Sequence, residues 1–136
     1  MAFVDRKIQM MTQFGNNFTG VPSAQIVWDG VPNKSIDKNS PWISFYIDPV
    51  AGNFGSMGAT RRIRHTGFVV VQIFIKPGTT TKDADTLVDD VADTLESKCL
   101  IDGVTFGVTE IVRVGVRDGY QQINTFTRYR YDDLRS

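Results

Sequence analysis

Apolar residues near the start of the chain recur at helical spacing. They are Val4, Ile8, Met11, Phe14 and Phe18. Residues three, four and seven positions apart lie on the same side of a helix. The pattern therefore predicts an amphipathic helix from Ala2 to about Phe18, which Gly20 and Pro22 end.

Two stretches after this helix indicate strands. The short apolar piece AQIVWDG is surrounded by prolines, asparagines and small polar residues, which predicts a short strand and then an irregular arm. In WISFYID, the side chains of Ile43, Phe45 and Ile47 alternate with more polar positions, as in a strand with one face on the core. We expect the stretch from Pro49 to Gly58 to end this strand.

The run TGFVVVQIFI is apolar at both parities. Val69, Val71 and Ile73 alternate with Phe68, Val70 and Phe74. A strand buried on both faces has this composition. We predict that this run is the middle strand of the sheet, covered on both faces.

A second helix is predicted after Lys76-Pro77-Gly78. Thr80 and Asp83 have the spacing of a capping box. The apolar stripe that follows consists of Ala84, Leu87, Val88, Val91, Ala92 and Leu95. Acidic residues occupy the other face, which is most simply a solvated surface and alternatively a face for a partner. They are Asp85, Asp89, Asp90, Asp93 and Glu96.

The C-terminal third predicts a hairpin. Its first strand reaches Arg117 and carries apolar residues of one parity, interrupted by Glu110: Val104, Phe106, Val108, Val112, Val114 and Val116. Asp118-Gly119 favours a type I′ turn. In the return strand one face carries Ile123, Thr125, Thr127, Tyr129 and Tyr131, and the other carries Arg128 and Arg130.

The order helix, strands, helix, hairpin predicts an α+β fold. The 136 residues, 1–136, are expected to form a single domain with a mainly antiparallel or mixed sheet. The N-terminal helix and the second amphipathic helix accompany this sheet, the second packed on one of its faces.

Charge and composition limit the possible functions. Fifteen Lys and Arg residues balance fifteen Asp and Glu residues, so a general polyanion binder is disfavoured. The absence of a long apolar run predicts no export and no membrane. The single cysteine, Cys99, excludes an internal disulfide and favours a reducing, cytosolic setting.

Catalytic and metal chemistry find little support in the residues. One histidine and one cysteine leave only an all-carboxylate metal site, and the spacing of the acids matches no calcium loop. His65 lies among arginines, which weaken a base, and Cys99 is typical of an inert core thiol. We therefore expect no enzyme, no cofactor and no metal.

The segment GSMGATRRIRHTG leaves two alternatives open. Nucleic-acid binding would use cations with aromatic faces, here Arg61, Arg62, Arg64, Arg128, Arg130, Tyr120, Tyr129 and Tyr131. The balanced total charge argues against it. The other interpretation is that the cationic loop and the acidic helix contact neighbouring copies of the same protein.

The order of motifs resembles the tail-terminator family of long-tailed bacteriophages. The likeness rests on IVWDGVPN, SPWISFYIDP, a glycine-rich loop, RRIRHTGFVVVQIFIKPGTTTKDADTLVDDVADTLES and the closing valine-rich hairpin. It implies a structural virion protein that forms a hexameric ring, caps the tail tube, ends its polymerisation and offers a surface for head joining. Another neck or head-to-tail connector protein is the alternative.

The resemblance also implies partners and a location. The partners are other copies of the chain, the tail-tube protein and a head-completion or neck protein, with genomic DNA passing through the channel without sequence-specific binding. The protein would lie in the neck region of the virion tail, after assembly in the host cytoplasm.

Two segments are the candidate contact regions. Loops held by a rigid sheet commonly carry contact residues. The loop from Gly52 to Arg64 is the candidate intersubunit or tail-tube contact, with Asn53, Phe54, Met57, Arg61, Arg62 and Arg64. The irregular arm from Val31 to Ser40 is the second candidate, with Val31, Asn33, Lys34, Asp37 and Lys38.

Overall fold

A computed structural model confirms the predicted α+β fold and its order of elements. It describes residues 3–30, 36–37, 40–54, 61–76, 81–117 and 119–135. The elements are α1 (Phe3–Asn17), the 3-10 turn η1 (Ser23–Gln25), β1 (Ile26–Trp28), β2 (Trp42–Phe54), β3 (Arg61–Ile75), α2 (Thr81–Asp93), the π-helical turn η2 (Thr94–Lys98), β4 (Val104–Arg117) and β5 (Tyr120–Arg135).

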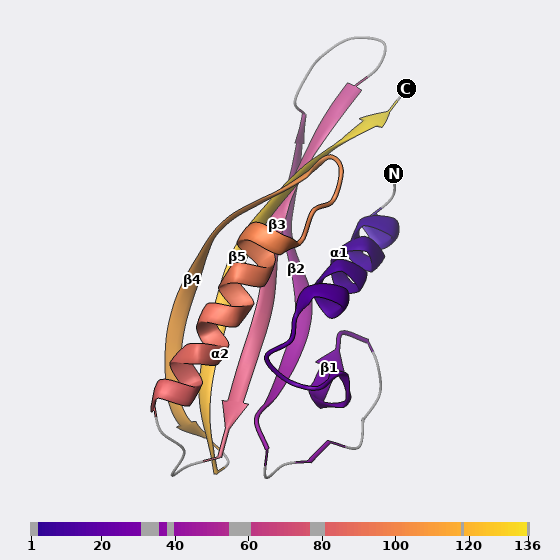
Figure 1. Cartoon of the computed structure of the whole chain (residues 1–136). Helices are drawn as coiled ribbons and strands as arrows, with labels where there is room; N and C mark the ends of the chain where they lie inside the picture. Colours follow the sequence, from indigo (N-terminus) through magenta and orange to yellow (C-terminus); the bar gives the residue numbers. More distant parts are fainter. Residues whose placement is uncertain are drawn as a thin grey trace.

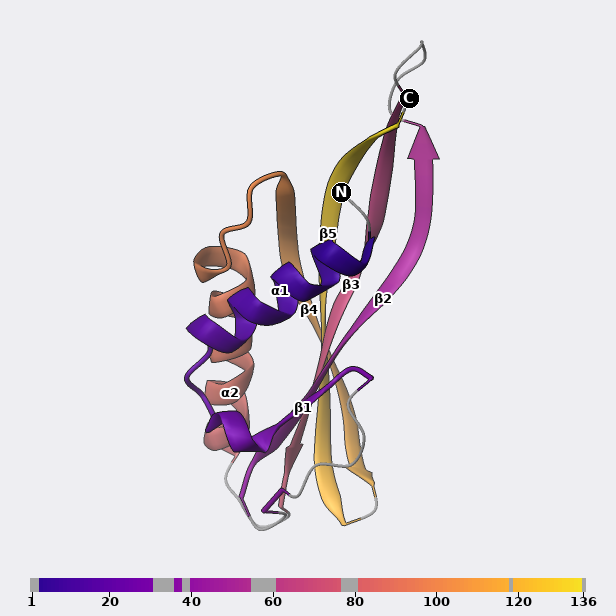
Figure 2. The same ribbon diagram turned by 90° about the vertical axis from the view of Figure 1, so that its right-hand side faces the viewer.

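The five strands form one mixed sheet in the order β1-β2-β3-β5-β4. β1 runs parallel to β2, and the other neighbours are antiparallel. Figures 1 and 2 show that α1 and α2 lie on the same face of this sheet. The described elements thus form two layers, and none of the described helices covers the opposite sheet face, which we call the open face. Neither described helix combines the length and apolarity that crossing a lipid bilayer requires.

The buried faces of the two helices agree with the sequence-based predictions to different degrees. In α2 the predicted stripe is confirmed, since Ala84, Leu87, Val88, Val91 and Leu95 are buried. In α1 the helix is confirmed but its apolar side is partly wrong. Met10, Phe14 and Phe18 are buried, whereas Val4 and Ile8 are more than half exposed. The apolar side chains that α1 buries thus lie in its C-terminal half.

Aromatic rings hold that half of α1 in place. Phe14 stacks on Phe18 with ring centroids 4.8 Å apart, and it lies 4.8 Å from Phe45 of β2. Trp28 of β1 meets Phe14 edge to face at 6.3 Å. Aromatic pairs at these distances stabilise a core beyond their buried area.

β3 is confirmed as the middle strand, and the expectation that both of its faces are covered is confirmed only in part, because on the face away from the helices Val70 is 1% exposed while its neighbours are more accessible. Val69, Val71 and Ile73 are buried beneath the helices. On the open face Phe68 and Phe74 are only half-buried. Their cover comes from neighbouring side chains, since Phe74 stacks on Trp42 at 4.1 Å and Phe68 meets Phe126 at 6.2 Å.

The predicted end of β2 at Pro49 is also wrong. The strand continues to Phe54 and stays paired with β3, with one register shift between Pro49 and Ala51. β1 pairs only with Ile43 to Phe45, so Pro49 lies where β2 is itself an edge strand. A proline is tolerated there because no strand needs its missing N–H.

The hairpin of β4 and β5 is confirmed, but the single apolar face of β4 is wrong. Arg117 pairs with Tyr120, which leaves a two-residue turn, and Gly119 has a φ of 79°. Asp118 lies outside the described residues. Register shifts between Phe106 and Thr109, and between Arg113 and Gly115, break the parity of β4. Several of its valines are consequently exposed.

Candidate functional site

The sheet ends in a narrow three-stranded tip. β4 begins at Val104, which pairs with Tyr131 of β5, and Tyr131 pairs in turn with His65 of β3. Beyond this level only β2, β3 and β5 continue, through residues 53–54, 61–64 and 132–135. We call these residues the tip. Figures 1 and 2 show them extending past both helices.

The tip contains most of the first predicted contact set. Asn53, Phe54, Arg61, Arg62 and Arg64 all belong to it. Met57 and the rest of the glycine-rich loop lie outside the described residues. The structure therefore places the predicted residues together on one projection, although they come from two strands.

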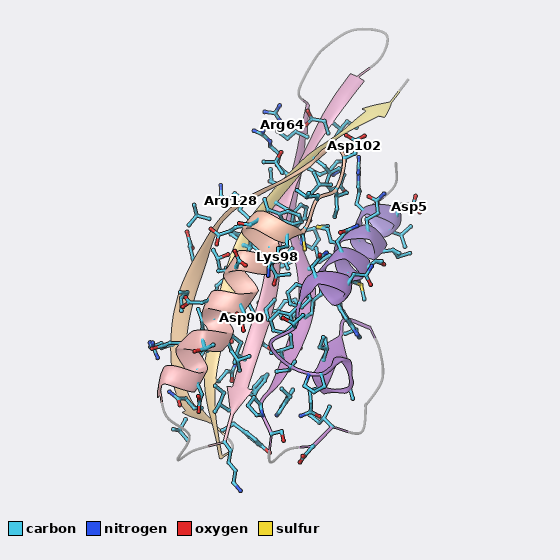
Figure 3. All side chains as sticks on the ribbon, viewed as in Figure 1. Asp5, Arg64, Asp90, Lys98, Asp102 and Arg128 are labelled. Carbon is cyan, nitrogen blue, oxygen red and sulfur yellow. The ribbon has the colours of Figure 1, made fainter. Side chains whose placement is uncertain are left out.

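Arg64 is partly engaged within the tip. Its Nε donates to Oδ1 of Asp132 at 3.1 Å, and the two side chains are 41% and 31% exposed. An ion pair with this much exposure adds little stability. Figure 3 shows Arg64 near this end of β3, distant from Asp90 and Lys98 near α2.

A stack of side chains joins the root of the tip to α1. The ring of His65 stacks on Tyr131 at 4.8 Å, and the guanidinium of Arg6 lies 5.4 Å from the same tyrosine ring. Arg6 also donates to the backbone oxygen of Asp102 at 2.8 Å. The sequence did not indicate Arg6, because its partners are distant in the chain.

These contacts give His65 a packing role. Its Nε2 atom is buried and has no hydrogen-bond partner within the part of the chain that the structure describes. Cys99 is 6% exposed, and burial raises its pKa to about 11. The predicted place of Cys99 in the core is confirmed, and the burial of its thiol disfavours the thiolate. Among the described residues no three His, Cys, Asp or Glu side chains converge as metal ligands.

The constellation expected for nucleic-acid binding is not brought together. Tyr129 and Tyr131 are 1% and 2% exposed beneath the helices. Arg128 and Arg130 are exposed on the opposite face of β5, where Arg128 lies over the ring of Phe68 at 5.4 Å. Of the predicted set, Arg128 and Arg130 therefore lie on the opposite face of β5 from Tyr129 and Tyr131.

The second predicted contact set lies at the other end of β2. Asp37 is described, while Val31, Asn33, Lys34 and Lys38 lie outside the described residues. Gln25, 6% exposed, donates to the backbone oxygens of Asp37 and Pro41 at 2.8 and 3.2 Å. Its Oε1 accepts from the amide of Asp37 at 2.9 Å. A lone glutamine at the start of the short apolar piece AQIVWDG gave no signal of this role.

The two predicted sets do not form one site. The strand β2 begins at Trp42, beside the segment of Asp37, and reaches the tip at Asn53. At about 3.3 Å per residue these ends are roughly 35 Å apart. The chain thus has two separate candidate surfaces, one at each end of the sheet.

The fold has known counterparts. Neither a protein-family model nor a curated protein matches the sequence. A chain from the virion of a native gene transfer agent particle superposes with a TM-score of 0.63, covering 98% of this chain and 100% of its own, at 18% identity. A second solved protein, whose name describes no activity, gives a TM-score of 0.63 over 98% and 96% of the two chains, at 10% identity. This protein therefore has the fold of a chain found in a virion.

Proposed function

We propose that this protein is a structural component of a phage-type virion, and specifically a tail terminator. One observation carries the proposal: the fold matches a chain from a gene transfer agent virion over the full length of both chains. The resemblance in sequence motifs points to the same class. The proposed role is a hexameric ring that caps the tail tube, ends its polymerisation and offers a surface to the head.

The two ends of the sheet suit this role. A ring between a tube and a head needs one contact surface toward each, and the tip and the segment of Asp37 lie at opposite ends of β2. We propose that the tip contacts the tail-tube protein. The opposite end is then available to a head-completion or neck protein, with DNA passing through the ring. No step of this function needs a cofactor or a catalytic residue.

Tube capping tests the proposal directly. Purified protein is added to polymerising tail-tube subunits, and tube lengths and tube ends are recorded by electron microscopy. We expect shorter tubes with capped ends. Unchanged lengths and bare ends would contradict termination, and binding to a neck protein without binding to tubes would indicate a connector instead.

DNA binding provides a second check. The ring is proposed to pass DNA without gripping it, so binding of short single- and double-stranded DNA is expected to be weak. Micromolar or tighter affinity with a steep salt dependence would contradict the proposal, because several phosphates would then be neutralised.

Replacing His65 by Ala serves as the control for catalysis and is expected to leave capping intact.

A further inference from the structure

β4 is an edge strand with an unusual surface. It is the last strand in the sheet order, and no strand among the described residues pairs with its outer side. Its sequence, VTFGVTEIVRVGVR, contains neither lysine nor proline. Both residues are common devices that keep an exposed edge from pairing with another chain. β4 has two register shifts instead, and these leave residues 109–113 as a regular stretch between them.

Exposed apolar side chains gather on this strand. Among the described residues seven large hydrophobic side chains are exposed, and four of them belong to β4. They are Val108 at 78%, Ile111 at 51%, Val112 at 48% and Val116 at 68%. Ile111 pairs with Thr125 on the face beneath the helices and Val112 with Asn124 on the open face, so exposed apolar side chains lie on both faces of this edge strand. Exposed apolar side chains gathered on one strand indicate an interaction site.

The charged residues of β4 leave its edge accessible. Nη2 of Arg113 donates to Oδ1 of Asp85 in α2 at 2.7 Å. This contact directs the guanidinium toward the helix layer and leaves the backbone edge between Thr109 and Arg113 without a cation across it. Glu110 pairs with Phe126 on the open face.

Along the opposite edge of the same sheet, most of β2 has no strand partner among the described residues. β1 covers only Ile43 to Phe45, and no other strand within the described part pairs with the outer side of β2. β1 and β2 run in one direction and β4 runs in the other, because β4 is antiparallel to β5, β5 to β3, and β3 to β2. The two free edges therefore differ in sequence and in strand direction.

We propose that β4 of one subunit pairs with the β1–β2 edge of a second copy of this chain. The inference rests on the proposed ring and names the joint between its subunits. When copies are related by rotation about an axis along the strands, β4 of one copy meets β1 and β2 of the next in the antiparallel sense. The sheet then continues from subunit to subunit with all helices on one side.

A second copy is the occupant that explains both edges together. Two unlike edges on one molecule make a head-to-tail contact, and such a contact forms a ring when the rotation between successive copies closes. Within one molecule the edges cannot meet, since three strands lie between β1 and β4 and neighbouring strands are about 4.8 Å apart. A two-fold contact of β4 with β4 would leave the β1–β2 edge unused and would stop at a dimer.

Charge placed on the edge tests the joint. Val108→Lys with Val112→Lys puts two solvated cations on β4 at exposed positions, so the monomer is expected to keep its unfolding midpoint. The molar mass in solution, measured by light scattering, is expected to fall from that of an oligomer to that of a monomer. The matched control is Val4→Lys with Ile8→Lys, at positions of α1 that are 58% and 56% exposed, and it is expected to keep the oligomer. A wild-type chain that is monomeric at high concentration, or an oligomer unchanged in the β4 variant, overturns the proposal.

Cross-linking tests whether β4 of one subunit lies beside β1 of the next. Val112→Cys and Val27→Cys, each in a Cys99→Ala background, are mixed and treated with a short bis-maleimide. Both positions lie on the open face, since Val112 pairs with Asn124 and Val27 with Ser44. A covalent product between the two variants is expected. Cross-links of Val112→Cys only to itself, or no cross-links, contradict the head-to-tail joint.

The capping assay separates this inference from the proposed function. If wild-type protein caps tubes and the β4 variant keeps its oligomeric mass, the joint is wrong and the function stands. If the mixed cross-link forms and tubes are not capped, the joint is right and the terminator assignment is wrong.

Discussion

Gly67 and Tyr129 illustrate how single residues set the packing just below the tip. A Cβ on Gly67 would lie 2.6 Å from the backbone oxygen of Asp48 and 2.6 Å from the hydroxyl oxygen of Tyr129. Tyr129 is 1% exposed, so its ring has no free space to move into. The glycine is required here because the tyrosine ring lies across β3 at its position.

Gly67→Ala is therefore expected to destabilise the protein by about 1–3 kcal/mol, the usual cost of overpacking a core. The free energy of unfolding in urea measures this effect. Gly107→Ala is the control in the same sheet, because its nearest contacts, to Arg128, would be ordinary ones at 3.7 Å. Equal effects of the two substitutions would show that backbone freedom, and not the tyrosine ring, sets the cost.

Two buried weakly acidic groups, the Cys99 thiol and the Tyr129 hydroxyl, make the stability of the fold sensitive to alkaline pH. Burial raises the pKa of Cys99 from 9.0 to about 11. Burial, with smaller contributions from Tyr131 and Asp48, raises the pKa of Tyr129 from 10.0 to about 12. Above these ordinary values the unfolded chain releases its protons while the folded chain retains them. Stability is thus complete below pH 9 and falls as the pH rises.

The loss is expected to reach about 1.4 kcal/mol per pH unit for each group while it is ionised only in the unfolded chain. Urea unfolding at a series of alkaline pH values measures the slope. In Cys99→Ala the part of the slope that begins near pH 9 should disappear, and the part that begins near pH 10 should remain. An unchanged slope in Cys99→Ala would contradict the assignment.

At the scale of elements, Gln25 attaches the segment of Asp37 to the start of β1. Its side chain satisfies three backbone groups, two carbonyl oxygens and one amide. These bonds are part-buried, and each contributes on the order of 0.5–1.5 kcal/mol. Gln25 therefore holds in position the segment of Asp37, the candidate contact surface at the end of the sheet opposite the tip.

Gln25→Ala is expected to cost about 1–3 kcal/mol and to expose the amide of Asp37 to hydrogen exchange. Amide exchange followed by NMR measures the second effect at that residue. Gln25→Glu retains an acceptor for this amide and loses both donors, so the amide should stay protected while stability falls. Unchanged protection of Asp37 in Gln25→Ala would show that another contact holds the segment.

Local sequence patterns predicted which helices and strands form better than they predicted which face of each element is buried. The stripe of α2, the central place of β3 and the hairpin of β4 and β5 each follow from short-range periodicity or turn chemistry, and the structure confirms them. In α1 the side that packs depends on where the helix meets β1 and β2. In β4 two register shifts change which side chains face the helices, and such shifts leave no periodic signal.

At the scale of the whole molecule, the tip and the segment of Asp37 lie at opposite ends of one sheet. The sequence indicated both as contact regions, and the structure separates them by the length of β2. Their charges are expected to select partners and to fix register more than to add affinity. The exposed edge of β4, which the sequence did not indicate, adds a third surface at the side of the sheet.

Charge reversal in the tip tests its role. Arg61→Glu with Arg62→Glu is expected to weaken tube capping about tenfold or more, a loss of at least ~1.4 kcal/mol at the interface. The unfolding midpoint of the monomer should not change. Lys98→Glu with Arg130→Glu makes the same change in charge outside the tip and should leave capping intact. An unfolded Arg61/Arg62 variant would show that these arginines support the fold instead.

By itself, the sequence determined the α+β class, the amphipathic second helix, the central strand and the closing hairpin. Each depends on side-chain periodicity or on turn residues that act over a few positions. Only the tertiary structure decided that both helices cover one face, that β2 continues past Pro49, and that the apolar residues of β4 lie at an open edge. Those features depend on which strands become neighbours, and strand pairing joins residues that are far apart in the chain.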